Sequence, residues 1–111
     1  MSKAERKPKE KGKTTFADEI GRKEKALVLF YATWCPYSQR FLPIFKEYSK
    51  TNPEECLSVV VDDNPEVCEE YSIEYYPTVI LFRKGEAKKR LDAEPGIGLD
   101  RKQLKDFTEN E

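Results

Sequence analysis

Residues 26–38 read ALVLFYATWCPYS, and this stretch decides the fold. Its first half, residues 26–32, is an unbroken apolar run rich in strand formers, which predicts a strand covered on both faces. Cys35 follows that strand, and the apolar spacing beyond it predicts a helix over residues 35–50, kinked at Pro43. The inward face of this helix is predicted to hold Phe41, Ile44, Phe45 and Tyr48. The stretch therefore predicts a strand–helix unit with Cys35 at the junction.

The rest of the chain continues this alternation of strands and helices. Before residues 26–38 we predict a short helix from Thr15 to Gly21. After the helix over 35–50 we predict a strand over 57–62 and then a helix with Asn64 as N-cap. A strand over 78–82, a short antiparallel strand near 88–91 and a final helix opened by the capping box at 100–103 complete the chain. Strands that alternate with helices and end in a hairpin predict an α/β fold. We therefore expect a central mixed sheet of four or five strands, sandwiched by helices.

A chain of 111 residues suits a single domain, but its charge is unevenly distributed. Residues 1–13 contain six Lys/Arg and two Glu, so we predict a disordered basic tail there and one domain over 14–111. This tail either keeps the protein soluble or serves as a basic arm that binds RNA or acidic partners. Residues 54–74 contain eight acidic side chains and no basic one, which predicts a solvated face, with partner selection by charge as the alternative. The net charge of −1 predicts no nucleic-acid and no membrane partner.

The amino-acid content restricts both the chemistry and the compartment. The sequence has no histidine, which removes Ser-His and Cys-His catalysis and the commonest zinc ligand. Its three cysteines are an odd number without paired spacing, so we predict reduced thiols, no disulfide framework, no metal site and no cofactor. We see no secretory signal and no run of about 18 apolar residues, so we expect a cytoplasmic location.

Cys35 occupies a position at which reactive side chains are common. It lies outside the carboxyl end of a predicted strand and at the start of a helix, whose amides and dipole favour an anion. A cysteine in such a position is the better nucleophile at neutral pH. Pro36 suits the first helical turn, because its missing N–H would have no partner there. A buried, inert cysteine is the alternative for this position.

Several motifs together resemble the thioredoxin family. They are Trp34-Cys35-Pro36, Pro43, the turn at 62–65, Tyr76-Pro77-Thr78 and the final helix, and the likeness covers residues 15–108. The resemblance implies a thioredoxin fold and a thiol–disulfide oxidoreductase whose Cys35 attacks a substrate disulfide. It also implies that Pro77 is cis, packs against Cys35 and presents the Tyr76 backbone to an extended peptide. The further candidates for substrate binding beside Cys35 are Trp34, Pro36 and Tyr37.

Three positions depart from the family pattern. Ser38 stands where a thioredoxin has its resolving cysteine, and a serine cannot form a disulfide. Leu29 stands where the family has a buried acid, and Ser58 stands where a lysine often partners that acid. Losing all three together favours a native single-thiol design over a trap variant made by changing one cysteine to serine. We expect the Ser38 hydroxyl to donate a hydrogen bond to the Cys35 thiolate.

A single-thiol mechanism needs a second thiol from elsewhere. Cys56 and Cys68 are predicted to lie about 14 Å apart along the strand direction, too far for a disulfide between them. Cys68 lies nearer to the Cys35 end of the sheet and is the candidate internal resolving thiol, but its glutamate neighbours disfavour a thiolate. Cys56 is predicted to be structural. We therefore expect an external thiol or a reductase to release the substrate from Cys35.

The CPYS motif at residues 35–38 also resembles single-thiol glutaredoxins, which use glutathione and in some cases bind an iron–sulfur cluster between two protomers. The sequence after Pro77, TVILFRKGE, lacks the glycine pair of a glutathione-binding signature. Iron–sulfur ligation across a dimer and a non-catalytic client-binding module with an incidental Cys35 are the alternatives. Our main prediction is a monomeric oxidoreductase that acts through Cys35 on disulfide-containing proteins or small molecules.

Overall fold

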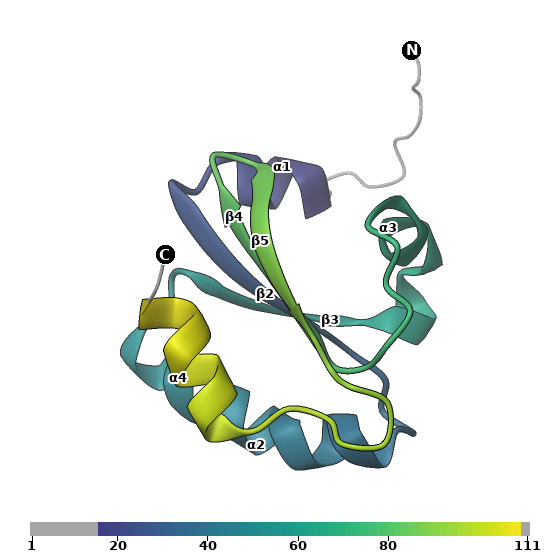
Figure 1. Cartoon of the computed structure of the whole chain (residues 1–111). Coiled ribbons are helices and arrows are strands. Elements are labelled where there is room, and N and C mark those ends of the chain that lie inside the picture. The colour runs from purple at the N-terminus through teal and green to yellow at the C-terminus, as the bar shows by residue number, and fades with distance from the viewer. Residues whose placement is uncertain (1–15, 110–111) are drawn as a thin grey trace.

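The computed structural model describes residues 16–109, which form one sheet between two layers of helix (Figure 1). The predicted basic tail over 1–13 and the Thr15 cap lie outside the described residues. No helix in the described part of the chain is long and apolar enough to cross a membrane. The elements are α1 (Phe16–Gly21), β2 (Lys25–Tyr31), α2 (Pro36–Thr51), β3 (Cys56–Val60), η2 (Val61–Asp63), α3 (Pro65–Glu70), β4 (Thr78–Arg83), β5 (Glu86–Asp92) and α4 (Arg101–Glu109).

The sheet is mixed, as predicted, and its strands lie in the order β3-β2-β4-β5. β2 pairs with β3 in parallel and with β4 antiparallel, and β4 pairs with β5 as the predicted hairpin. The two turn residues of this hairpin, Lys84 and Gly85, both have positive φ (52° and 86°), a geometry that matches the twist of paired strands. The described residues therefore confirm the α/β sandwich with a sheet of four strands.

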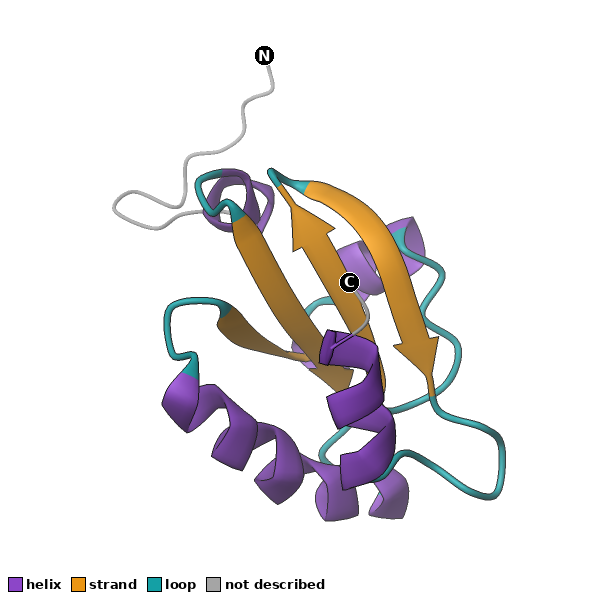
Figure 2. Ribbon diagram, turned by 60° about the vertical axis from the view of Figure 1, so that its left-hand side comes forward, coloured by secondary structure: helices purple, strands orange, loops and turns teal. Residues whose placement is uncertain are grey.

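β2 is buried on both of its faces, which explains its unbroken apolar run. Successive side chains of a strand point to opposite faces. Val28 and Phe30 belong to a core that α1 and α3 cover, whereas Leu27 and Leu29 belong to a core that α2 and α4 cover. Figure 2 shows α2 and α4 together over one face of the sheet. All four of these β2 side chains are almost completely buried, so the strand holds the two layers together.

The segment after β3 differs from the prediction. The strand ends at Val60 and not at residue 62, and a 3-10 turn over Val61–Asp63 follows it. Asn64 takes the N-cap position of α3, but its side chain makes no capping bond and donates to the Val60 carbonyl oxygen at 2.9 Å. The amide thus ties the turn back to the end of β3. The apolar pattern could not reveal this turn, because Val61 is buried in it as it would be in a strand.

The final helix begins as predicted. In its capping box the Gln103 N–H donates to Asp100 Oδ1 at 2.8 Å, and the Asp100 N–H donates to Gln103 Oε1 at 3.0 Å. Leu104 is buried and Phe107 is half-buried in the core between α4 and the sheet. The loop before this helix, residues 93–99, brings the chain back past the end of the sheet at which Cys35 lies.

Candidate functional site

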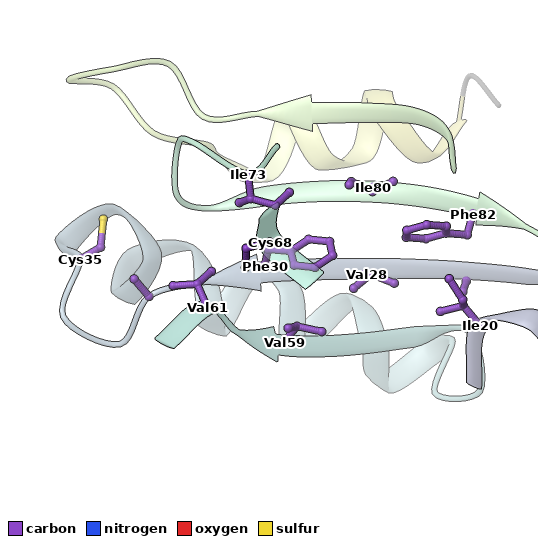
Figure 3. Packing of buried hydrophobic residues seen from close by; sticks show 12 residues of the cluster. Ile20, Val28, Phe30, Cys35, Val59, Val61, Cys68, Ile73, Ile80 and Phe82 are labelled. Carbon is purple, nitrogen blue, oxygen red and sulfur yellow. The ribbon is translucent and has the colours of Figure 1, made fainter. Parts of the chain in front are cut away.

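Cys35 lies at the junction between β2 and α2. It is the N-cap residue of α2, with extended backbone angles (φ −92°, ψ 123°), and Pro36 is the first residue of the helix. The Gln39 N–H donates to the Cys35 carbonyl oxygen at 2.9 Å and closes the first helical turn. Figure 3 shows Cys35 at one end of the buried cluster under α1 and α3. The sulfur therefore lies at a helix N-terminus, where the local field favours an anion.

The segment that faces Cys35 contains the peptide bond between Tyr76 and Pro77, which is cis, as the family resemblance implies. The Cys35 thiol donates a hydrogen bond to the Tyr76 carbonyl oxygen, with 3.7 Å between sulfur and oxygen. Pro77 is buried, and its carbonyl oxygen accepts a hydrogen bond from the Ala93 N–H at 3.1 Å. The structure thus brings together Cys35, Tyr76 and Pro77 from two segments that are far apart in the sequence.

The Ser38 side chain is buried and does not form the predicted hydrogen bond to the Cys35 sulfur. Its Oγ accepts a hydrogen bond from the Ala32 N–H at 3.2 Å, and the residue is 1% exposed. Ser38 and Cys35 are both described residues, and no hydrogen bond joins them. A buried hydroxyl pairs with an available backbone donor, and the turn after β2 supplies one. Ser38 therefore fixes the loop that carries Cys35.

Trp34, the residue before Cys35, has an exposed side chain. Its side chain is 61% exposed, and its indole Nε1–H donates to Asp62 Oδ2 at 2.9 Å. The ring also meets the Tyr76 ring edge-to-face, with 5.8 Å between the centroids. These two contacts orient a large apolar surface that is open to solvent. The sequence placed Asp62 at the end of a predicted strand and at the start of the 62–65 turn, but it predicted no contact with Trp34. In the structure Asp62 lies in the 3-10 turn Val61–Asp63.

Three large hydrophobic side chains are exposed in the described part of the chain, and we call them the apolar rim: Trp34, Tyr75 and Ile97. Sequence reasoning missed Tyr75 and Ile97. Ile97 lies in the turn of residues 94–98, which packs against Tyr37. Tyr37, a predicted substrate-binding candidate like Trp34, is half-buried. The sequence offered one signal for Ile97: it is an apolar residue between two glycines, Gly96 and Gly98, and therefore lies in a predicted turn and not in a core element.

The other two cysteines have less reactive surroundings. Cys56 pairs with Leu27 near the start of β2, whereas Cys35 follows the end of that strand. Burial raises the pKa of the Cys56 thiol to about 11, and the Glu55 carboxylate adds to the effect. Burial also raises the pKa of Cys68, and the second cause is Asp62, not the glutamates of its own helix. Neither thiol is well placed to form a thiolate at neutral pH.

We expect the Cys56 thiol to resist alkylation at neutral pH. With a pKa of about 11 it is about 300-fold less ionised at pH 7 than a free thiol of pKa about 8.5. A more basic thiolate is also more nucleophilic, so the net effect is a rate about 20-fold lower. The rate should rise about tenfold per pH unit up to about pH 11, because the thiolate is the reacting form.

The measurement is alkylation by iodoacetamide between pH 7 and pH 10, with each cysteine followed by peptide mass spectrometry. The chain unfolded in urea is the control, since burial no longer acts on any thiol there. Equal rates for Cys56 in the folded and the unfolded chain would contradict the expectation.

Leu29 and Ser58, two of the positions that depart from the family pattern, are direct partners across β2 and β3. Leu29 is completely buried in the core under α2 and α4, whereas Ser58 is exposed. A carboxylate buried at the Leu29 position would cost free energy unless it were paired, and Ser58 carries no charge to pair with it. The two departures are therefore consistent with each other.

Comparison with known proteins finds thioredoxins at the level of a family model, of sequence and of solved structures. The family model described as Thioredoxin matches residues 7–109 of the chain. The thioredoxin of Rickettsia bellii is 36% identical over 77 residues, which are 67% of this chain and 73% of that protein. The solved structure of Plasmodium falciparum thioredoxin aligns with a TM-score of 0.75 at 30% identity and covers 85% of this chain and 88% of that one.

Similarity also extends to parts of longer proteins. Human endoplasmic reticulum resident protein 44 is 40% identical over 82 residues, which are 66% of this chain. The chain spans only 20% of the length of that relative. The matched region is therefore a single unit within a larger protein.

Proposed function

The chain belongs to the thioredoxin family, and from this membership we propose that it is a thiol–disulfide oxidoreductase of the single-thiol type. In the proposed reaction the Cys35 thiolate attacks one sulfur of a substrate disulfide. A mixed disulfide forms, and the other substrate sulfur leaves as a thiolate that takes a proton from solvent. An external thiolate then attacks the Cys35 sulfur and releases the substrate as a thiol. A second external thiolate attacks the external sulfur of this new mixed disulfide, so that Cys35 leaves as a thiolate and the two external sulfurs form a disulfide.

One observation carries this proposal. The thiol at the N-terminus of α2 faces the cis Tyr76–Pro77 bond, while the residue one turn later, Ser38, is a buried serine bonded to the backbone. The first feature supports attack on a disulfide, and the second removes the thiol that would complete an internal disulfide. The raised pKa values of Cys56 and Cys68 argue against either of them as the replacement.

The proposed substrates are disulfide-containing proteins, which would bind as extended chains. β4 begins at Thr78, so the backbone of Tyr76 lies outside the strand and is not used by the sheet ladder. A substrate strand laid against this segment would bring its sulfur to Cys35, and the apolar rim would contact the neighbouring side chains. Small disulfides would react with the Cys35 thiol without this strand-like contact.

We also propose a setting for this reaction. The three free cysteines suit a reducing compartment, so the cytoplasm stays our prediction for the location. The external thiol would come from a glutathione-like molecule or from a partner reductase, and the protein would act as a monomer. Sedimentation velocity of the reduced protein tests the last point, because a stable dimer would be visible directly.

The experiment that tests the proposal is intact-mass analysis after the reduced protein meets oxidised glutathione. We expect a single glutathione adduct, located on Cys35 by peptide mapping, that excess small thiol releases. Cys56 and Cys68 should stay unmodified on the same timescale. If no adduct forms, or if these two thiols react as fast as Cys35, then Cys35 has no special reactivity and the proposal is wrong.

A second candidate function is a client-binding module without redox chemistry. It is favoured because apolar side chains are exposed while the sulfur is almost buried. Cys35 is only 8% exposed, whereas its neighbour in the sequence, Trp34, is 61% exposed. Such a surface could hold an extended chain whether or not the sulfur reacts. In that case binding of a client peptide would survive Cys35→Ala unchanged, and no mixed disulfide would accumulate with the wild-type protein.

A further inference from the structure

The side chain of Arg40 connects the helix that carries Cys35 to the turn of residues 94–98. Arg40 lies in the second turn of α2 and is exposed. Its Nη2–H donates to the Ile97 carbonyl oxygen at 2.7 Å. Its guanidinium carbon lies 5.4 Å from the centroid of the Tyr37 ring, in a cation–π contact. One side chain therefore contacts both the turn and a residue of the CPYS motif.

The turn lies so close to α2 that only glycine fits at one of its positions. Gly98 is buried and has φ +83°. A Cβ added there would come within 3.0 Å of both Arg40 Nη2 and Tyr37 Cδ1. Inside the turn, the Ile97 and Gly98 N–H groups both donate to the Glu94 carbonyl oxygen at 3.0 Å. The turn is thus compact in itself and is packed directly on the motif.

The result of these contacts is a fixed place for an exposed side chain. Ile97 is 60% exposed although its carbonyl oxygen is bound by Arg40. The start of the same loop is bound at Ala93, whose N–H donates to the Pro77 carbonyl oxygen. The loop therefore runs from the cis-peptide segment to the N-terminal turns of α2, and it presents Ile97 along that path.

We propose that Arg40 is a positioning residue that holds Ile97 as a selective contact for disulfides flanked by apolar side chains. The contact would act between the cis-peptide segment and the first turns of α2, which are the two ends of the loop that carries Ile97. Burying an apolar flanking residue against Ile97 would favour its mixed disulfide over that of a polar one. This inference rests on the proposed function, because Cys35 supplies the reaction that reports the selection.

The test compares three disulfides that differ in what flanks the reacting sulfur. Two are peptides of five residues whose central cysteine is disulfide-bonded to thionitrobenzoate and is flanked by leucine in one peptide and by serine in the other. The third is dithiobis-nitrobenzoate, which has no peptide. In each case Cys35 displaces thionitrobenzoate, whose colour gives the second-order rate constant for attack.

We expect Arg40→Met to lower the rate with the leucine peptide about fivefold, which corresponds to about 1 kcal/mol of lost contact. Methionine keeps an unbranched apolar side chain at this position but has no N–H to donate to Ile97. The rates with the serine peptide and with the small disulfide should not change. Ile97→Ser should lower the leucine rate by a similar factor, and the double variant should show little further loss, because both changes remove one contact.

Lys46→Met is the matched control, since it removes one positive charge from an exposed position of the same helix. It should leave all three rates unchanged. If Arg40→Met keeps the preference for leucine, or lowers all three rates together, the inference is wrong while the proposed function stands. If the wild-type chain attacks none of the three disulfides, the proposed function is wrong and the inference fails with it.

Discussion

Replacing Ser38 with cysteine should make release of the substrate independent of external thiol. The side chain lies one helical turn from Cys35, and such neighbours have Cβ atoms about 5–6 Å apart. A disulfide needs about 3.5–4.5 Å between Cβ atoms, so a shift of about 1–2 Å would close the bond. A thiol held there acts at an effective concentration in the millimolar range or above. At micromolar external thiol the variant should release a mixed disulfide about a thousandfold faster than the wild-type chain.

The measurement is the rate at which a glutathione adduct on Cys35 disappears, followed by intact mass at several concentrations of reduced glutathione. Ser38→Ala is the matched control: it loses the same bond to the Ala32 N–H but gains no thiol. Both variants should lose about 1 kcal/mol of stability, yet only Ser38→Cys should release the adduct by itself. A Ser38→Cys variant that still depends on external thiol would mean that position 38 is not placed to resolve Cys35.

Cys35→Ala should abolish disulfide exchange. Cys35 is the cysteine at a helix N-terminus that faces the Tyr76 carbonyl oxygen, and the pKa values of Cys56 and Cys68 are both raised. Without the nucleophile the reduction of a protein disulfide by glutathione should fall to the uncatalysed rate, a loss of about a thousandfold or more. The measurement is the steady-state reduction of a disulfide-bonded protein with glutathione as the external thiol.

Cys56→Ala and Cys68→Ala are the controls for this loss, and each should keep most of the wild-type rate. Each also leaves a small cavity in or beside the core, so thermal unfolding should be recorded alongside activity. A large loss of exchange in a folded Cys68→Ala would indicate that Cys68 resolves the mixed disulfide on Cys35. That result would replace the external thiol of the proposal with an internal one.

The strand–helix unit around Cys35 could be predicted because its signals are local. The apolar run of β2 is buried on both faces, and Pro36 and the α4 capping box lie where the sequence placed them. The mixed sheet and its closing hairpin follow from the alternation of strands and helices together with a hairpin turn. These features depend on periodicity and on turn residues that act within a few positions of the chain.

The parts of the site that could not be predicted depend on contacts between distant segments. Arg40 reaches Ile97, 57 positions away in the sequence, and Trp34 reaches Asp62, 28 positions away. Ser38 was expected to bond to the sulfur, because its spacing from Cys35 suggests a neighbour. In the fold its hydroxyl points to the Ala32 N–H, since burial requires the nearest donor to be paired. Spacing gives proximity along a helix, but not which partner a polar group selects.

The lifetime of the glutathione adduct on Cys35 in the wild-type chain is the most direct measurement. The purified adduct, freed of small thiols, is incubated anaerobically at neutral pH and followed by intact mass. We predict that it persists until reduced glutathione is added and that it is then lost with full recovery of the reduced protein. Loss of the adduct without added thiol, together with an internal disulfide between Cys35 and Cys68 or Cys56, would contradict a single-thiol mechanism.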